Sequence, residues 1–282
     1  MNIVFSDIDG TFQELGKEIP SINREAIQAL QAKGDHFVFV TGRGYDLVKQ
    51  MNDELLIDCD VIFGNGAGIK KVGEPERYTS TLTHQETKEV IDILEEQEIL
   101  YFIHTDRGVV IRPTKEYTKQ LSALRESLEK LGEQGKRIMD YKEQYFENDC
   151  VHTEDIAKYL SERPEIIVVK IELMEADDER HEVIRSSLQE TELLVFHSFI
   201  KTLEIVHPNS TKGSAITNYL SDYPLATSYG IGDGENDLAM LAVVDVPVAV
   251  ENAAINVKEN SHVIAPSCSE GGVGQFIFEH VL

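Results

Sequence analysis

Acidic side chains that could hold a metal ion occur in two short stretches of this 282-residue chain. Asp7 and Asp9 follow an apolar run near the N-terminus, and Gly232-Asp233-Gly234-Glu235-Asn236-Asp237 contains three acids and an amide within six residues. Carboxylates this close either shift each other's pKa values or recruit a divalent cation, and such hard oxygen ligands suit Mg²⁺. Taken alone, each stretch could also be a solvated turn, because Asp-Gly is a common turn dipeptide.

Two further stretches offer groups that bind anions. Thr41-Gly42-Arg43 places a hydroxyl and backbone N–H groups next to the start of a predicted helix, which can cradle a phosphate. The ordinary interpretation of this stretch is a glycine turn with a threonine helix cap. Lys212 opens another predicted helix, where a cation opposes the helix macrodipole. An incidental exposed lysine is possible there, but a lysine that neutralises a bound anion explains the placement better.

The elements that must position these stretches alternate between strand and helix. Short apolar runs predict buried strands at 3–5, 37–40, 61–63, 227–231 and 246–250. Helical patterns between them predict a parallel sheet with right-handed crossovers. Open parallel sheets bind ligands at the carboxyl edge of their strands, so the four stretches are expected to meet there.

The middle of the chain has a different pattern, which predicts a separate α+β domain. It contains a helical pattern through Val90 and Leu94 and a hairpin with its turn at Asp106-Arg107-Gly108. The charged stretch 132–136 is predicted to be a loop. The predicted domains are 1–79 with 208–282 for the α/β core, and 80–207 for the inserted domain.

Composition limits the partners and the compartment. The net charge is −24, from 50 acidic and 26 basic residues, and such a field repels nucleic acids and anionic membranes. An anionic substrate therefore needs local cations. The three cysteines are far apart, and the N-terminus has neither a basic region nor a long apolar region. We expect a cytoplasmic protein, and the sequence does not indicate its oligomeric state.

The four stretches together resemble the motifs of the haloacid dehalogenase-like (HAD) superfamily, and the resemblance covers essentially the whole chain. Asp7-Ile8-Asp9-Gly10-Thr11 is similar to its first motif, Thr41 and Lys212 to the second and third, and Gly232-Asp233 through Asn236-Asp237 to the fourth. The insertion is placed and sized like a C2-type (IIB) cap. Asn65-Gly66-Ala67 and the run 232–241 resemble the Cof-type subfamily. Glu251 departs from many relatives, which have a small or neutral residue there.

The resemblance implies a doubly wound, Rossmann-like parallel-sheet core with a cap, and a Mg²⁺-dependent phosphatase of small phosphorylated metabolites. It implies that Asp7 is the nucleophile and forms an aspartyl-phosphate, while Asp9 protonates the leaving alcohol and then activates water. Mg²⁺ would be held by Asp7, the Asp9 backbone carbonyl and Asp233, and Asp237 would orient the waters of the metal. The phosphate would be held by Ile8, Thr41, Gly42, Lys212 and Asn236; possible substrate contacts are Arg43, Asn65 and Arg107.

Two other functions remain open at this point. A sugar phosphomutase shares the first half-reaction, so the four motifs cannot separate it from a phosphatase. A non-catalytic phosphosugar sensor would have no need for Asp9. The substrate is not indicated: sugar phosphates, pyridoxal phosphate and flavin mononucleotide are all compatible. The inserted domain is expected to act as a lid, on which His104, Asp106 and Arg107 either set specificity or simply face solvent.

Overall fold

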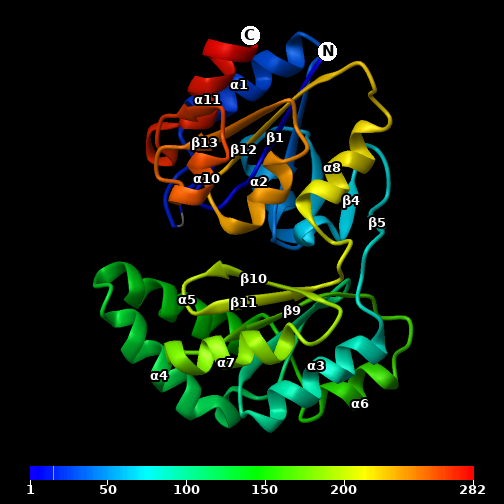
Figure 1. The fold of residues 1–282 in the computed structure, drawn as a ribbon, viewed down its shortest axis with the longest axis vertical. Coiled ribbons are helices and arrows are strands. Elements are labelled where there is room, and N and C mark those ends of the chain that lie inside the picture. Colours follow the sequence, from blue (N-terminus) through cyan, green and yellow to red (C-terminus); the bar gives the residue numbers. More distant parts are fainter. Residues whose placement is uncertain (15) are drawn as a thin grey trace. The chain divides into compact units, whose positions relative to one another are not determined.

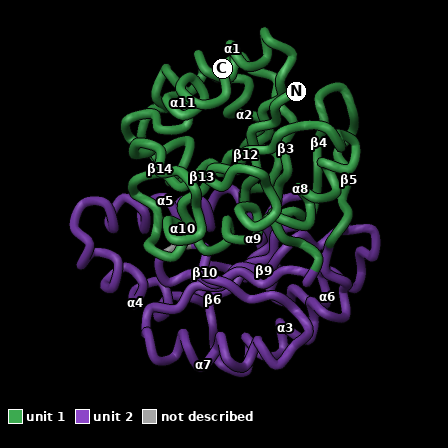
Figure 2. The backbone as a smooth tube through the Cα atoms, turned by 45° about the horizontal axis from the view of Figure 1, so that its top comes forward, with its two compact units in different colours: residues 1–80, 209–282 green, residues 81–208 purple. Residues whose placement is uncertain are grey.

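The computed structural model describes residues 1–14 and 16–282 (Figure 1). These form two compact units (Figure 2). The core unit comprises residues 1–80 and 209–282, and the inserted unit comprises residues 81–208. No helix of the described part of the chain is both long and apolar enough to cross a membrane.

The core unit is built on one sheet with the strand order β14-β13-β12-β1-β2-β3-β4-β5. The strands from β14 to β3 run parallel, while β4 and β5 are antiparallel. This confirms the predicted doubly wound α/β fold. The strands are β1 (Asn2–Ser6), β2 (His36–Val40), β3 (Asp60–Phe63), β4 (Gly68–Lys70), β5 (Arg77–Tyr78), β12 (Thr227–Gly232), β13 (Val246–Val250) and β14 (Val263–Ala265).

Helices cover both faces of the core sheet, as right-handed crossovers on either side of β1 require. On one face lie α1, α2 and α11, and on the other lie α8, α9 and α10 (Figure 2). The helices are α1 (Ser21–Ala32), α2 (Tyr45–Leu55), α8 (Lys212–Leu220), α9 (Leu238–Leu241), α10 (Ile255–Glu259) and α11 (Gly272–Phe276). In α1, the buried stripe of Ala26, Ile27 and Leu30 faces the sheet. In α2, Val48 and Met51 are buried, whereas Leu47 is exposed.

The antiparallel edge formed by β4 and β5 was not predicted from the sequence. Both strands are very short, and their residues are only partly buried or exposed. They therefore lack the apolar run that indicates a buried strand. The edge pairs with β3 just after the chain turns at Asn65, which has a left-handed backbone with φ 57°.

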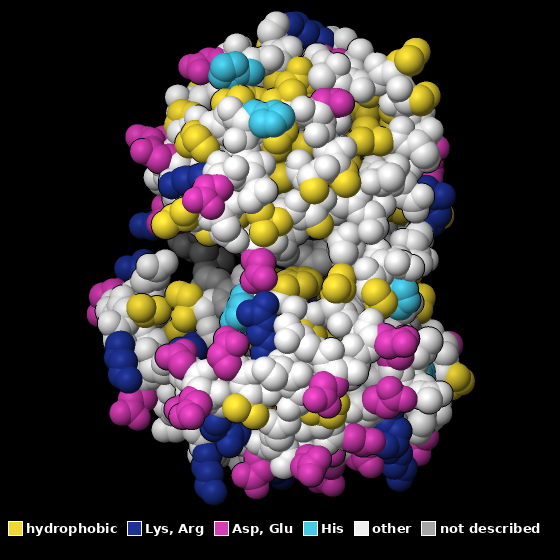
Figure 3. Space-filling view, viewed as in Figure 1, with side chains coloured by type: hydrophobic (Ala, Val, Ile, Leu, Met, Phe, Trp, Pro, Cys, Tyr) yellow, Lys and Arg dark blue, Asp and Glu magenta, His cyan; other side chains and the backbone are white. Residues whose placement is uncertain are grey.

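The inserted unit is built on a second sheet with the strand order β10-β11-β9-β6-β7-β8. Its pairs are antiparallel except β7 with β8. The strands are β6 (Leu100–Thr105), β7 (Gly108–Ile111), β8 (Val151–His152), β9 (Val168–Met174), β10 (Leu194–Phe199) and β11 (Thr202–Val206). The helices are α3 (His84–Glu96), α4 (Thr118–Glu129), α5 (Glu133–Asn148), α6 (Ile156–Ser161) and α7 (Asp178–Leu188). On the face shown in Figure 3, acidic side chains gather more densely over this unit than over the core unit.

The prediction of a loop at 132–136 is wrong, because helix α5 begins at Glu133. Gly132, with φ 75°, precedes the helix, and the buried side chains of Ile138, Met139 and Phe146 hold it in place. Gly135 lies so close to α4 that a Cβ atom there would be 1.8 Å from the Leu128 carbonyl oxygen. Gly135 therefore makes the close contact with α4. The charged residues that suggested a loop lie on the exposed face of α5.

Candidate active site

The turn after β1 places Asp7 and Asp9 at the carboxyl edge of the core sheet. The Asp7 N–H donates to the Ile231 carbonyl on β12 at 3.0 Å, which holds the backbone just after β1 against β12. The carbonyl of Ile8 then accepts the N–H groups of Phe12 and Gln13, each at 2.9 Å, and closes the turn. Asp7 is buried, with 6% of its surface exposed, whereas Asp9 is exposed.

Lys212 joins the N-terminal turn to the acidic stretch after β12. Its Nζ donates to Asp7 Oδ1 and to Asp237 Oδ1, both at 2.6 Å, and its side chain is 0% exposed. The lysine is the first residue of α8, whose N-terminus is capped by the hydroxyl of Thr211. Gly213 then packs against the Ala239 carbonyl, where a Cβ would lie 2.2 Å away. This close approach brings the start of α8 to the start of α9.

Asp237 holds the loop that carries Asp233. Its Oδ2 accepts the N–H groups of Asp233 at 2.9 Å and Gly234 at 3.0 Å, while its Oδ1 accepts from Lys212. Asp233 in turn accepts the Thr11 hydroxyl at 2.7 Å through Oδ1. A Cβ on Gly10 would lie 2.4 Å from Asp233 Oδ2, and its φ is +85°. Both the space and the backbone therefore require glycine at this position.

Three carboxylates form this cluster, and two of them, Asp7 and Asp237, contact the Lys212 ammonium. Oxygens of Asp7, Asp233 and Asp237 lie within 4.8 Å of one another. Burial raises the pKa of Asp7 well above its usual range and that of Asp233 to about 6, and neighbouring carboxylates add to both shifts. Burial lowers the pKa of Lys212, but the charges of Asp237 and Asp7 outweigh it, so the pKa lies above its usual range.

The donor set fits a divalent cation. When all groups are ionised, one ammonium leaves two of the three negative charges uncompensated in a largely buried site, which is costly. Lys212 donates to Oδ1 of Asp7 and Thr11 donates to Oδ1 of Asp233, and each carboxylate has a second oxygen of the hard type that Mg²⁺ prefers. Both oxygens of Asp237 are used within the protein, so its geometry suits a residue that positions the ligands.

The loops after β2 and β3 join the same edge of the sheet. Thr41 is buried, its carbonyl accepts the Asn65 N–H at 2.9 Å, and its hydroxyl accepts the Arg43 N–H at 3.1 Å. Asn236 donates to Asn65 Oδ1 at 3.2 Å, which links these loops to the acidic stretch. Within residues 1–14 and 16–282, no acceptor receives the N–H of Ile8 or Gly42. Their role in binding phosphate stays a prediction.

Arg43 forms a bidentate pair with Asp9 that sequence reasoning missed. Its Nε and Nη2 donate to the two Asp9 carboxylate oxygens at 2.8 and 2.6 Å. Two further contacts of the site were also missed: the Thr11 hydroxyl bond to Asp233, and the bond at 2.7 Å from Asn252 Nδ2 to the Gly10 carbonyl. Thr11 lies inside the first motif, but the sequence gives no sign of its partner.

The residues predicted on the inserted unit make local contacts there. Arg107 lies at the β6–β7 turn and pairs with Glu165 at 3.0 Å, and the Asp106 carboxylate accepts the Ile167 N–H at 2.9 Å. His104 hydrogen-bonds Glu172 at 3.0 Å. A role in specificity for these three residues stays a prediction.

Known proteins resemble this chain in sequence and in fold. The sequence model of haloacid dehalogenase-like hydrolases matches residues 4–277. Over 286 aligned residues, 98% of this chain and 97% of the other, the chain is 28% identical to the 5-amino-6-(5-phospho-D-ribitylamino)uracil phosphatase of Bacillus subtilis. A haloacid dehalogenase-like hydrolase of B. subtilis has a similar fold, with a TM-score of 0.85 at 20% identity over 100% of both chains. A HAD subclass IIB sugar phosphatase has a TM-score of 0.76 at 21% identity, covering 99% of this chain and 98% of its own.

Proposed function

Because this chain belongs to the haloacid dehalogenase-like hydrolases, we propose that it hydrolyses small phosphorylated metabolites with Mg²⁺ as cofactor and Asp7 as nucleophile. The chain is a phosphoric monoester hydrolase, like its named relatives. One observation carries the finer proposal: the buried Lys212 ammonium lies between Asp7 and Asp237, and Asp233 completes the cluster within 4.8 Å.

The first step is attack on phosphorus by Asp7. Lys212 holds the Asp7 carboxylate in place; one of its oxygens attacks phosphorus, the other stays available to the metal, and an aspartyl-phosphate forms as the bond to the leaving alcohol breaks. The transferring oxygens would be held by Lys212, by the N–H groups of Ile8 and Gly42, by the Thr41 hydroxyl and by the Asn236 amide. These donors supply the local positive field that a chain of net charge −24 otherwise lacks.

The metal would be held by Asp7, the backbone carbonyl of Asp9 and Asp233. When bound, Mg²⁺ supplies positive charge that stabilises the negative charge of the transferring oxygens. Asp237 positions this set, because it holds both the Lys212 ammonium and the backbone of Asp233.

Asp9 is the proton carrier of the proposed reaction. It gives a proton to the leaving oxygen and later takes one from the water that cleaves the aspartyl-phosphate. Both of its oxygens accept hydrogen bonds from Arg43 in this structure. We expect this pair to open when Asp9 transfers its proton, which would release Arg43 to contact the substrate. Asn65, beside the phosphate donors, and Arg107, on the inserted unit, are further candidates for contacts with the leaving group.

A phosphate-release screen tests the proposal. The panel should contain sugar phosphates, pyridoxal phosphate, flavin mononucleotide and 5-amino-6-(5-phospho-D-ribitylamino)uracil, the substrate named for the B. subtilis relative. We expect release from at least one compound with Mg²⁺ and none with a chelator. Formation of a bisphosphorylated sugar without free phosphate would favour a phosphomutase. Binding without any turnover would favour a sensor.

A further inference from the structure

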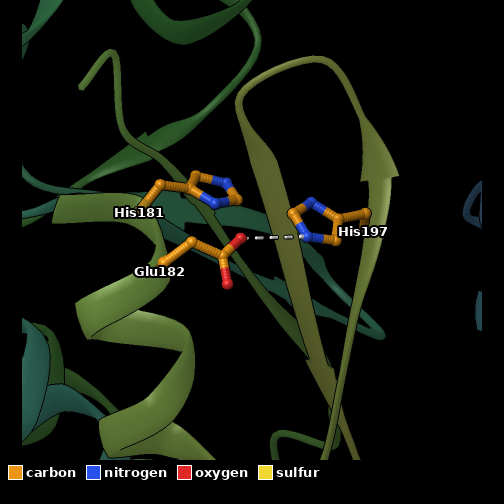
Figure 4. A group of neighbouring side chains, drawn as sticks. All are labelled: His181, Glu182 and His197. Carbon is orange, nitrogen blue, oxygen red and sulfur yellow. Dashed lines mark ion pairs between the residues drawn. The ribbon is translucent and has the colours of Figure 1, made fainter. Parts of the chain in front are cut away.

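A second group of possible metal ligands lies within the inserted unit. His181 and Glu182 are neighbours on α7, and His197 lies on β10 (Figure 4). One ligand atom from each of the three side chains lies within 4.8 Å of the others. Figure 4 shows the two rings and the carboxylate facing a common space between the helix and the strand. No part of the proposed phosphatase mechanism uses these residues.

His181 has a buried nitrogen that lacks a partner. Only 5% of the residue is exposed, and its Nε2 makes no hydrogen bond within the described residues. A buried polar atom without a partner costs free energy, and nearly all such atoms in folded proteins are satisfied by protein, water or an ion. The unpaired nitrogen is therefore an independent sign that something binds here.

The other two side chains can move to complete a site. Glu182 is exposed, with 65% of its side chain accessible, and His197 is 35% accessible. The Glu182 carboxylate lies 3.8 Å from His197 Nε2, and the two rings are almost parallel with centroids 4.9 Å apart. Burial, and to a lesser extent the neighbouring His197, lower the pKa of His181.

We propose that His181, Glu182 and His197 form a site for a borderline divalent cation such as Zn²⁺. Two imidazole nitrogens and one carboxylate oxygen are a ligand set that Zn²⁺ favours, with water in the fourth position, whereas Mg²⁺ prefers oxygen ligands alone. Bonds of about 2.0–2.2 Å require ligand atoms roughly 3.3 Å apart in a tetrahedral site. His181 is the fixed ligand, and Glu182 and His197 approach it by rotating their side chains. The bound ion would tie α7 to β10.

A Zn²⁺ titration of the full chain tests this site. Calorimetry in the presence of excess Mg²⁺ keeps the core carboxylates occupied, so that the heat reports on the second site. We expect one Zn²⁺ per chain in the wild type. Glu182→Gln and His197→Gln remove one ligand each from partly exposed positions, and each should weaken binding at least about tenfold.

The matched control is His280→Gln. His280 also lies 3.9 Å from a glutamate, Glu279, but it belongs to the core unit, and no group of three possible metal ligands among the described residues includes it. This variant should bind Zn²⁺ like the wild type. Zn²⁺ should also raise the melting temperature of the wild type but not of His197→Gln. The absence of stoichiometric binding, or equal affinity in wild type and His197→Gln, would overturn the proposal.

Discussion

Replacing Lys212 with methionine should destabilise the metal-free core unit far more than an ordinary lysine replacement. The Lys212 ammonium is the only cation that contacts Asp7 and Asp237 among the described residues. Methionine fills a similar volume but leaves two buried carboxylates facing each other. The variant therefore isolates the electrostatic role of the ammonium from its packing.

The magnitude follows from the burial of this ion pair. The Lys212 side chain is 0% exposed, and its two hydrogen bonds are 2.6 Å long. Removing one partner of a buried ion pair costs about 3–5 kcal/mol, because the remaining charge has lost its compensation. The loss should shrink at lower pH as the carboxylates take up protons, and added Mg²⁺ should offset part of it.

Hydrogen exchange measures this effect in the core unit alone. Peptides that cover β1 and β12 report the free energy of opening of that unit, with a chelator present. Lys49→Met is the matched control, because Lys49 lies in the same unit and pairs with Asp53 at 3.8 Å on the surface of α2. This exposed pair should contribute no more than about 0.5 kcal/mol. A loss in Lys212→Met no larger than that in Lys49→Met would refute the reasoning.

Three further results are expected. Asp7→Asn should abolish phosphate release without changing the circular dichroism spectrum, and Asp9→Asn should slow release by about 10²–10⁴-fold; normal turnover by Asp7→Asn would exclude it as nucleophile. The folded-state pKa of Asp233 is raised to about 6. The metal-free wild type should therefore lose stability relative to Asp233→Asn as pH rises from about 4 to about 6. A difference in the free energy of urea unfolding between the two proteins that stays constant over this pH range would contradict the shift. Gly10→Ala should raise the Mg²⁺ concentration needed for half-maximal activity and lower the melting temperature, both by more than Gly34→Ala does. Both glycines have positive φ, but only Gly10 faces Asp233. Equal effects of the two variants would show that crowding against Asp233 is unimportant.

The meeting of distant residues at one sheet edge was predictable from the sequence. Asp7 and Lys212 are 205 positions apart, yet their side chains are hydrogen-bonded. The alternation of apolar runs and helical patterns placed both residues at the carboxyl edge of a parallel sheet, where strand ends converge whatever their separation along the chain. The roles assigned to these residues in catalysis stay predictions.

The partners of individual side chains could not be predicted in the same way. The pair between Arg43 and Asp9 depends on the conformation of two loops, and the bond from Thr11 to Asp233 depends on where the Gly10 turn directs the chain. Helix α5 was missed because Gly132 and Gly135 resemble loop residues until the close contact with α4 is known. His181 and His197 belong to no sequence motif, because a helix and the strand after the next turn bring them together only in the folded chain.

Asp237 couples the effects of substitutions on the two sides of this site, because its two oxygens bind different parts of it. One carboxylate holds the ammonium of Lys212 through one oxygen and the backbone of Asp233 and Gly234 through the other. A substitution at Asp237 therefore disturbs the phosphate-binding and metal-binding sides at once, and single changes on either side are expected to combine non-additively. In directed evolution of this scaffold, new specificities should arise more readily from loops that leave this carboxylate intact.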